Sequence, residues 1–318
     1  MEGEPKFEEE ERSSIYDVVG GTEEEQNSVL DDHVYEMQTD TGKYFEVKEK
    51  LYQVKDFEKE KTEEEIKMVK IVLERLDNFM KDMGDPNPLK IRPEQVHFLY
   101  PDKIKAANLP LINFFDRRRQ FIGICDLGNS LENMQGLAHE TIHAHSFQSL
   151  EIDKDKSVSD RRFGIRTKIR GGQNYYFEEI NEAITEELTI IFDRNYLVSV
   201  PGLEKELELR QKFIDAHLQS NDPEIRESAD EIAYIKVNNQ KQQLEATGYS
   251  YPAARERFGS LVKEVFKANE TLFKSEDEVF MLFVQAAMGG RMLDLARVVE
   301  KTYGKGSFRK LGKVTAGK

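Results

Sequence analysis

The chain is short of cysteine, of long apolar stretches and of concentrated positive charge. Cys125 is its one cysteine, which excludes an internal disulfide and a cysteine-based zinc site and fits a reducing compartment. No stretch approaches the roughly 18 consecutive apolar residues that a membrane-spanning helix needs. The acidic start MEGEPKFEEEER lacks the apolar run of a signal peptide. Without a basic stripe, nucleic-acid binding is not expected either. We therefore expect a soluble, cytoplasmic globular protein that binds neither nucleic acid nor membrane.

Negative charge is in excess, and it is concentrated at the N-terminal end. The 46 Lys and Arg and 60 Asp and Glu side chains give a net charge of −14. Residues 1–66 hold 22 acidic and 8 basic side chains and account for all of it, so the remaining 252 residues are balanced with 38 of each sign. Residues 1–30 contain Glu runs and few large apolar side chains, which predicts a disordered, solvated segment. A sharper alternative is that one of its carboxylates folds back onto a metal ion and blocks it.

The pattern of apolar residues predicts helices and strands in mixed order. A short hairpin or strand is expected within residues 33–54, around the turn-like Thr39-Asp40-Thr41-Gly42. Further along, periodicity and turn residues predict a helix from Thr62 to Gly84, strands at 96–100 and 121–125, a helix over 131–150, a strand over 162–170 and a helix over 178–193. After Pro201-Gly202 the chain is predicted to be almost entirely helical up to Gly304.

Within the predicted helix 131–150, the sequence His139-Glu140-Thr141-Ile142-His143 has the spacing of a metal site. Residues four apart share a helix face, so both imidazoles can bind one ion. Glu140 can reach a metal-bound water without being a ligand. Neutral imidazoles leave Zn²⁺ its charge as a Lewis acid, and the carboxylate can then take the proton of the water. The motif alone is not specific, because such a site also needs a third protein ligand.

The predicted helix 178–193 offers that ligand. Glu182 follows His143 by 39 positions in the segment Asn181-Glu182-Ala183-Ile184-Thr185-Glu186. A glutamate on a following helix completes a His₂Glu site with one position open for water. Glu186 lies four residues further on the same face, where it can hydrogen-bond the far ring nitrogen of a liganding histidine.

The two motifs resemble those of the thermolysin-like and related gluzincin metallopeptidases. These enzymes carry HExxH and, on the next helix, a segment close to Asn-Glu-Ala-x-Ser/Thr-Asp/Glu. The match covers residues 137–188, and the interval between the motifs is longer than in thermolysin. The resemblance implies zinc ligands His139, His143 and Glu182, the general base Glu140, a carboxylate behind a ligand histidine at Glu186, and a supporting Asn181. It also implies that an edge strand, placed here at 121–125, binds the substrate backbone. The histidine or tyrosine that usually stabilises the oxyanion has no recognisable motif.

From these motifs we expect a zincin-like α+β fold, with a small, mostly antiparallel sheet against the HExxH helix. The predicted division is an acidic segment at 1–30, a catalytic domain at 31–200 and a helical C-terminal subdomain at 201–318. The predicted activity is zinc-dependent hydrolysis of a peptide or protein substrate. The alternative is a cytoplasmic zinc-binding sensor or partner-binding protein that keeps the site with restricted or no proteolysis.

The motif helices could also be ordinary amphipathic helices whose polar residues face solvent. Against this, the apolar residues Leu131, Met134, Leu137, Ala138 and Ile142 surround the two histidines. That face should therefore be buried, and buried polar groups without partners or a metal are costly.

Other polar side chains have simpler explanations than catalysis. His145 falls on the far side of its helix and is predicted to be packed there, and Cys125 is predicted to be a small core residue. Candidates for the transition-state donor are His217 in the helical tail and Tyr176, although core packing is the simpler role for Tyr175 and Tyr176. His33 and His97 are isolated, and Arg162, Arg166 and Arg170 alternate along the predicted strand, either on a solvated face or holding a substrate carboxylate.

Overall fold

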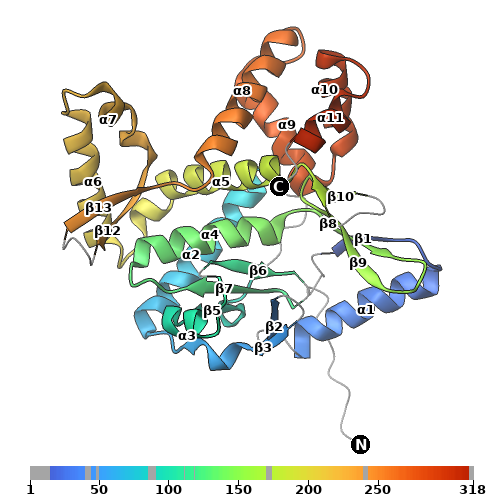
Figure 1. Ribbon diagram of the computed structural model, residues 1–318, viewed down its shortest axis with the longest axis horizontal. Helices are drawn as coiled ribbons and strands as arrows, with labels where there is room; N and C mark the ends of the chain where they lie inside the picture. Colours follow the sequence, from blue (N-terminus) through green and yellow to red (C-terminus); the bar gives the residue numbers. More distant parts are fainter. Residues whose placement is uncertain are drawn as a thin grey trace, which may run out of the picture.

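The computed structural model describes residues 15–39, 44–47, 50–84, 91–110, 112–117, 119–169, 174–238 and 243–314 and has an α+β architecture (Figure 1). The α-helices are α1 (Glu23–Thr39), α2 (Glu63–Asp82), α3 (Pro101–Ala106), α4 (Ser130–His145), α5 (Glu178–Asn195), α6 (Glu204–Leu218), α7 (Pro223–Glu227), α8 (Pro252–Ala268), α9 (Glu276–Gly289), α10 (Met292–Tyr303) and α11 (Ser307–Val314). The predicted α+β class is thus confirmed.

The strands form two larger sheets and two hairpins. They are β1 (Ile15–Val19), β2 (Tyr44–Val47), β3 (Lys50–Gln53), β4 (Glu58–Lys59), β5 (Val96–Leu99), β6 (Phe114–Asp116), β7 (Phe121–Cys125), β8 (Gln148–Ile152), β9 (Val158–Phe163), β10 (Arg166–Lys168), β11 (Tyr175–Tyr176), β12 (Ile232–Asn238) and β13 (Gln243–Gly248). One sheet has the order β4-β5-β7-β6 and the other β1-β8-β9-β10-β11, while β2–β3 and β12–β13 pair as antiparallel hairpins. The pairs β5–β7 and β1–β8 are parallel, and the other pairs in the two larger sheets are antiparallel.

Helices α4 and α5 lie side by side at the centre of the molecule (Figure 1). The four-stranded sheet and α2 cover α4 on one side, and α8 and α9 pack on α5 from the other. Asn129 starts α4 because its side chain accepts a hydrogen bond from the backbone N–H of Glu132. One hydrophobic cluster continues from α2 through α4 and α5 to α10. The predicted domain boundary near residue 200 stays a prediction.

The N-terminal region is more ordered than its composition predicted. We expected residues 1–30 to be disordered, but Ile15–Val19 forms β1 and Glu23–Thr39 forms α1, while residues 1–14 lie outside the described part. Strand β1 pairs with β8, and Ile15 and Val18 pack with Ile152. A few well-placed apolar residues are therefore enough to attach this acidic segment. The expected hairpin forms from β2 and β3. Its turn is not the expected one at residues 39–42, because both strands come after these residues.

Three element boundaries differ from the predictions. Helix α4 ends at His145 instead of residue 150, because Ser146 is extended, Phe147 N donates to Ala287 O and β8 begins at Gln148. The predicted strand 162–170 is interrupted at Gly164, whose φ is 59°. A left-handed turn there suits glycine, and a Cβ would lie 2.1 Å from the Asn181 side chain. The chain after residue 201 is not wholly helical, since it contains the β12–β13 hairpin. Within the described residues, no helix is long and apolar enough to cross a membrane.

Candidate metal centre

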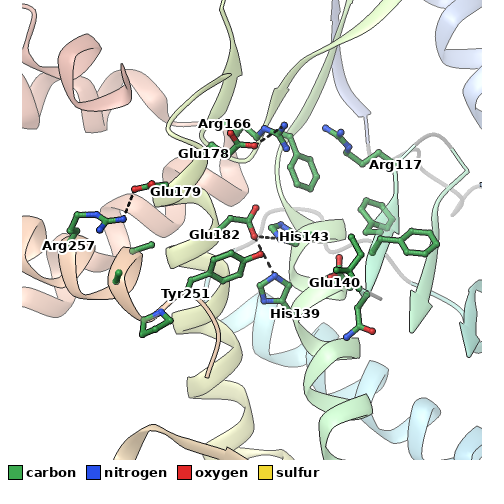
Figure 2. Close-up of a pocket in the computed structure, with 18 residues that line it drawn as sticks. Arg117, His139, Glu140, His143, Arg166, Glu178, Glu179, Glu182, Tyr251 and Arg257 are labelled. Carbon is green, nitrogen blue, oxygen red and sulfur yellow. Dashed lines mark hydrogen bonds and ion pairs between the residues drawn. The ribbon is translucent and has the colours of Figure 1, made fainter. Parts of the chain in front are cut away.

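The three predicted metal ligands meet between α4 and α5. His139 and His143 lie one turn apart on α4, and Glu182 lies on α5; their ligand atoms are all within 4.8 Å of one another. Glu182 Oε2 is 3.3 Å from His143 Nε2 and 3.6 Å from His139 Nε2 (Figure 2). Zinc bonds of about 2.0–2.2 Å at tetrahedral angles require ligand atoms about 3.3–3.6 Å apart. The donor set and the two distances from Glu182 therefore fit Zn²⁺.

The outer ring nitrogens have partners that turn both Nε2 atoms toward Glu182. His139 Nδ1 is 2.8 Å from Glu186 Oε2, and the hydroxyl of Thr185 lies 3.4 Å from His143 Nδ1. Because the Thr185 hydroxyl donates to Asn181 O, it can accept the proton of His143 Nδ1. A carboxylate or hydroxyl behind a ligand histidine fixes its tautomer. Glu186 thus contacts His139 as the sequence predicted.

Charge at the centre favours a cation. Burial lowers the pKa of His139, but hydrogen bonds with Glu182 and Glu186 raise it more, to about 10. Burial raises the pKa of Glu182, but the two histidines outweigh burial and hold it far below its ordinary value. The pKa of Glu186 is lowered as well, because hydrogen bonding with His139 outweighs its burial. The two ionised carboxylates attract a divalent ion, which must displace the proton of His139 in order to bind its ring nitrogen.

A cavity of about 700 Å³ opens over these residues (Figure 2). Glu140 lies in its wall and is 8% exposed. Burial raises the pKa of Glu140, while the two histidines and a hydrogen bond from the backbone of Phe115 act in the opposite direction. Phe115 belongs to β6, an edge strand of the four-stranded sheet that also lines the cavity. The prediction that residues 121–125 form an edge strand is wrong, because these residues form β7, which lies between β5 and β6.

Tyr251 reaches the same centre and was not found from the sequence. Its hydroxyl hydrogen-bonds with Glu182, and its ring stacks on His139 with centroids 6.0 Å apart and an interplanar angle of 18°. Burial and the carboxylate of Glu182 raise the pKa of the phenol. Tyr251 precedes α8, far from both motifs in the chain, and no spacing rule relates it to them. Only the tertiary fold identifies it, as is also true of the cavity residues Arg117 and Arg257.

The residues that the sequence offered as transition-state donors lie elsewhere. His217 on α6 has Nδ1 3.3 Å from Ser228 Oγ, and the Tyr176 hydroxyl is 3.4 Å from Arg309 Nε. Neither lines the cavity within the described residues. Asn181 supports the site indirectly, because its Oδ1 accepts a hydrogen bond of 3.0 Å from the N–H of Ile165 beside the Gly164 turn.

The arginines predicted to share one strand face do not do so. Arg162 is in β9 and Arg166 in β10, on either side of the Gly164 turn, and residue 170 lies outside the described part. Arg162 donates to the carbonyl oxygens of Gly164, Ala286 and Gly290. Arg166 does line the cavity, and its Nη2 is 3.2 Å from a carboxylate oxygen of Glu178. The turn therefore separates Arg162, which binds backbone carbonyl groups, from Arg166, which lines the cavity.

The remaining histidines and the cysteine lie away from the centre. His145 is buried with Nε2 3.7 Å from Asp77 Oδ1, and His97 Nδ1 is 2.7 Å from Glu58. His33 lies on α1. Cys125 is buried, and burial raises the pKa of its thiol to about 11. These positions agree with the packing roles predicted for His145 and Cys125.

No family model, curated protein or solved structure matches the chain. The site is therefore defined by its own motifs, distances and charges.

Proposed function

We propose that the chain is a zinc-dependent peptidase of the gluzincin type with a zincin-like fold. The observation that carries the proposal is the convergence of His139, His143 and Glu182, with Glu186 behind one of the histidines. Zn²⁺ held by these three side chains would act as a Lewis acid on a substrate carbonyl and activate a water molecule. The residues around the cavity support this chemistry.

Glu140 has the properties of a general base. Its carboxylate lies in the cavity wall beside both histidines, and burial raises its pKa, which makes the ionised carboxylate a stronger base. It can take a proton from the attacking water and give it to the leaving amine nitrogen as the C–N bond breaks. The backbone N–H of Phe115 holds the carboxylate in this position.

Strand β6 is suited to bind an extended substrate. It is the edge of its sheet, and its residues Phe114 and Phe115 line the cavity. An added strand can pair with an edge strand through backbone N–H and C=O groups. A peptide paired with β6 would run past the proposed zinc ligands, so β6 takes the role that the sequence assigned to 121–125.

Tyr251 is our proposed transition-state donor in place of His217 or Tyr176. Its phenol is protonated at neutral pH, since the ordinary pKa of tyrosine is about 10 and burial and Glu182 raise it further. As the carbonyl oxygen gains negative charge, the O–H can turn from Glu182 to that oxygen. A donor placed where charge develops lowers the barrier of acyl transfer.

The test combines zinc content with peptide cleavage for the wild type and Glu140→Gln. We expect about one zinc per chain in both proteins and cleavage of a peptide library by the wild type alone. The matched control is Glu179→Gln, a cavity carboxylate paired with Arg257, which should retain cleavage. Stoichiometric zinc without cleavage of any peptide would favour the sensor or partner-binding alternative. No bound zinc, together with normal folding of His139→Ala, would exclude both functions.

A further inference from the structure

A second buried polar cluster lies further along α4 and α5. Gln135 precedes His139 by one helical turn on α4, and Asp193 follows Glu186 by two turns on α5. Helical spacing therefore puts both residues on the faces that carry the metal centre. Asp193 is completely buried, and neither residue lines the cavity. We call Gln135, Asp193, Arg210 and Tyr249 the Asp193 cluster.

The cluster joins four parts of the chain through one carboxylate oxygen. Asp193 Oδ2 accepts hydrogen bonds from Arg210 Nη1 at 2.6 Å, from Gln135 Nε2 at 3.0 Å and from the hydroxyl of Tyr249. Gln135 and Arg210 also donate to Ala233 O, at 2.9 and 3.0 Å. Helices α4, α5 and α6 and the β12–β13 hairpin are thereby connected. All three side-chain bonds go to Oδ2, while Oδ1 of Asp193 has no partner among the described residues. Breaking a bond to a buried charge is costly, so we expect this geometry to be held rigidly.

Tyr249 begins a three-residue segment that contacts α5 at three points. Its hydroxyl binds Asp193, the N–H of Ser250 donates to Glu186 Oε1 at 2.7 Å, and the hydroxyl of Tyr251 binds Glu182. Two of these three contacts are with residues of the candidate metal centre. Any shift of Tyr249 would therefore displace the groups that contact Glu186 and Glu182.

The segment needs such an anchor because its last residue is strained. Tyr251 has φ 54° and ψ 39°, a left-handed conformation. For a residue with a Cβ this conformation is unfavourable and persists only where the surroundings impose it. Tyr251 is 44% exposed, so packing alone holds it weakly. The fixed point on its N-terminal side is the hydrogen bond of Tyr249 with Asp193.

We propose that the Asp193 cluster positions Tyr251 and Ser250 at the metal centre, so that Tyr249 and Asp193 are positioning residues for catalysis. The inference rests on the proposed function. Neither residue touches substrate; they act through Tyr251 on the reacting carbonyl and through Ser250 and Glu186 on His139.

A double-mutant cycle tests whether Tyr249 acts through Tyr251. We expect Tyr249→Phe to lower kcat about 10- to 100-fold, as a small misplacement of a catalytic group does, with KM changed less than twofold. In the Tyr251→Phe background, Tyr249→Phe should cause no further loss. The matched control is Tyr234→Phe, which removes a bond of 2.6 Å from the same hairpin to Glu132 of α4. It should leave kcat unchanged.

Zinc affinity gives a second readout that does not depend on turnover. Loosening Ser250 weakens its bond with Glu186, so Tyr249→Phe should raise the Kd for zinc about tenfold in competition with a chromogenic chelator. Tyr234→Phe should not. If Tyr249→Phe does not fold, Asp193→Asn is measured in the same way, with the same expected non-additivity.

Two kinds of failure can be told apart. In the first, the wild type cleaves peptides, but the losses of kcat caused by Tyr249→Phe and Tyr251→Phe multiply in the double variant, or Tyr249→Phe has the same kcat and Kd for zinc as Tyr234→Phe. The positioning role is then wrong, and the proposed peptidase activity stands. If the wild type neither binds zinc nor cleaves any peptide, the proposed function fails and this inference fails with it.

Discussion

Glu186 contacts both His139 on α4 and the segment that precedes α8. One carboxylate oxygen contacts His139 Nδ1 at 2.8 Å, and the other accepts the N–H of Ser250 at 2.7 Å. An ionised carboxylate in this position raises the basicity of the ligand imidazole. We therefore expect Glu186→Gln to raise the Kd for zinc at least tenfold, with activity recovered at saturating zinc. Chelator competition measures the Kd.

The control for this prediction is the next residue on α5. Glu187→Gln removes a carboxylate that pairs with Arg255 at 2.8 Å and has no contact with the histidines. It should leave the Kd for zinc within twofold of the wild type. Equal losses in the two variants would mean that Glu186 acts only through the net charge of the helix.

At the scale of residues, the sequence could predict only the part of the site that lies on two helices. The four-residue spacings of His139 with His143 and of Glu182 with Glu186 are local, so helical geometry alone aligns them. Tyr251 could not be predicted in this way. Its place depends on a hairpin and a left-handed turn, which only tertiary contacts define.

At the scale of elements, the close approach of α4 to the loop before β6 depends on Gly136. A Cβ at this position would lie 2.1 Å from Asn113 Nδ2, and Asn113 Oδ1 accepts the N–H of Cys125. Although alanine is the better helix former by about 1 kcal/mol, displacing Asn113 should outweigh that gain. We expect Gly136→Ala to lower the free energy of unfolding by about 1–2 kcal/mol, measured by urea denaturation.

Gly259 in α8 is the control for this prediction, because alanine there changes helix propensity without a steric clash. Apart from its chain neighbours and the backbone of its own helix, no atom of the described residues lies within 4 Å of a Cβ built at this position. We expect Gly259→Ala to stabilise the protein by up to about 1 kcal/mol. If Gly136→Ala stabilised it equally, the contact with Asn113 would not be a constraint.

Elements were predictable where local signals agreed with the tertiary fold. Helix α2 has a capping box formed by Thr62 and Glu65, and its apolar period was recognisable in the sequence. The end of α4 was not predictable, because Phe147 continues the apolar period while its backbone N–H bonds to Ala287 in α9. The β12–β13 hairpin was missed for a related reason. Its stability depends on contacts with α6 and α4, which a local pattern does not reveal.

At the scale of the whole molecule, the net charge of −14 is not spread over a separate tail. Part of the acidic region is built into the fold, since β1 pairs with β8 and Lys156 binds Glu25 at 2.5 Å. Charge balance along the chain therefore did not predict that residues 15–39 form β1 and α1. The apolar contacts of Ile15 and Val18 with Ile152 attach this segment instead.

The candidate centre also connects distant parts of the chain, which gives zinc a predictable effect on global stability. His139, Glu182 and Tyr251 come from α4, α5 and the segment before α8, and an unfolded chain would not hold them together. A ligand that binds only the folded state stabilises it by about 2.7 kcal/mol at 100 times its Kd. For a chain of this length, that free energy corresponds to a rise in Tm of about 4 °C. Calorimetry of chelator-treated protein with added Zn²⁺ should show this rise, whereas Mg²⁺, or Zn²⁺ added to His143→Ala, should show none; an unchanged Tm with Zn²⁺ would contradict metal binding at this centre.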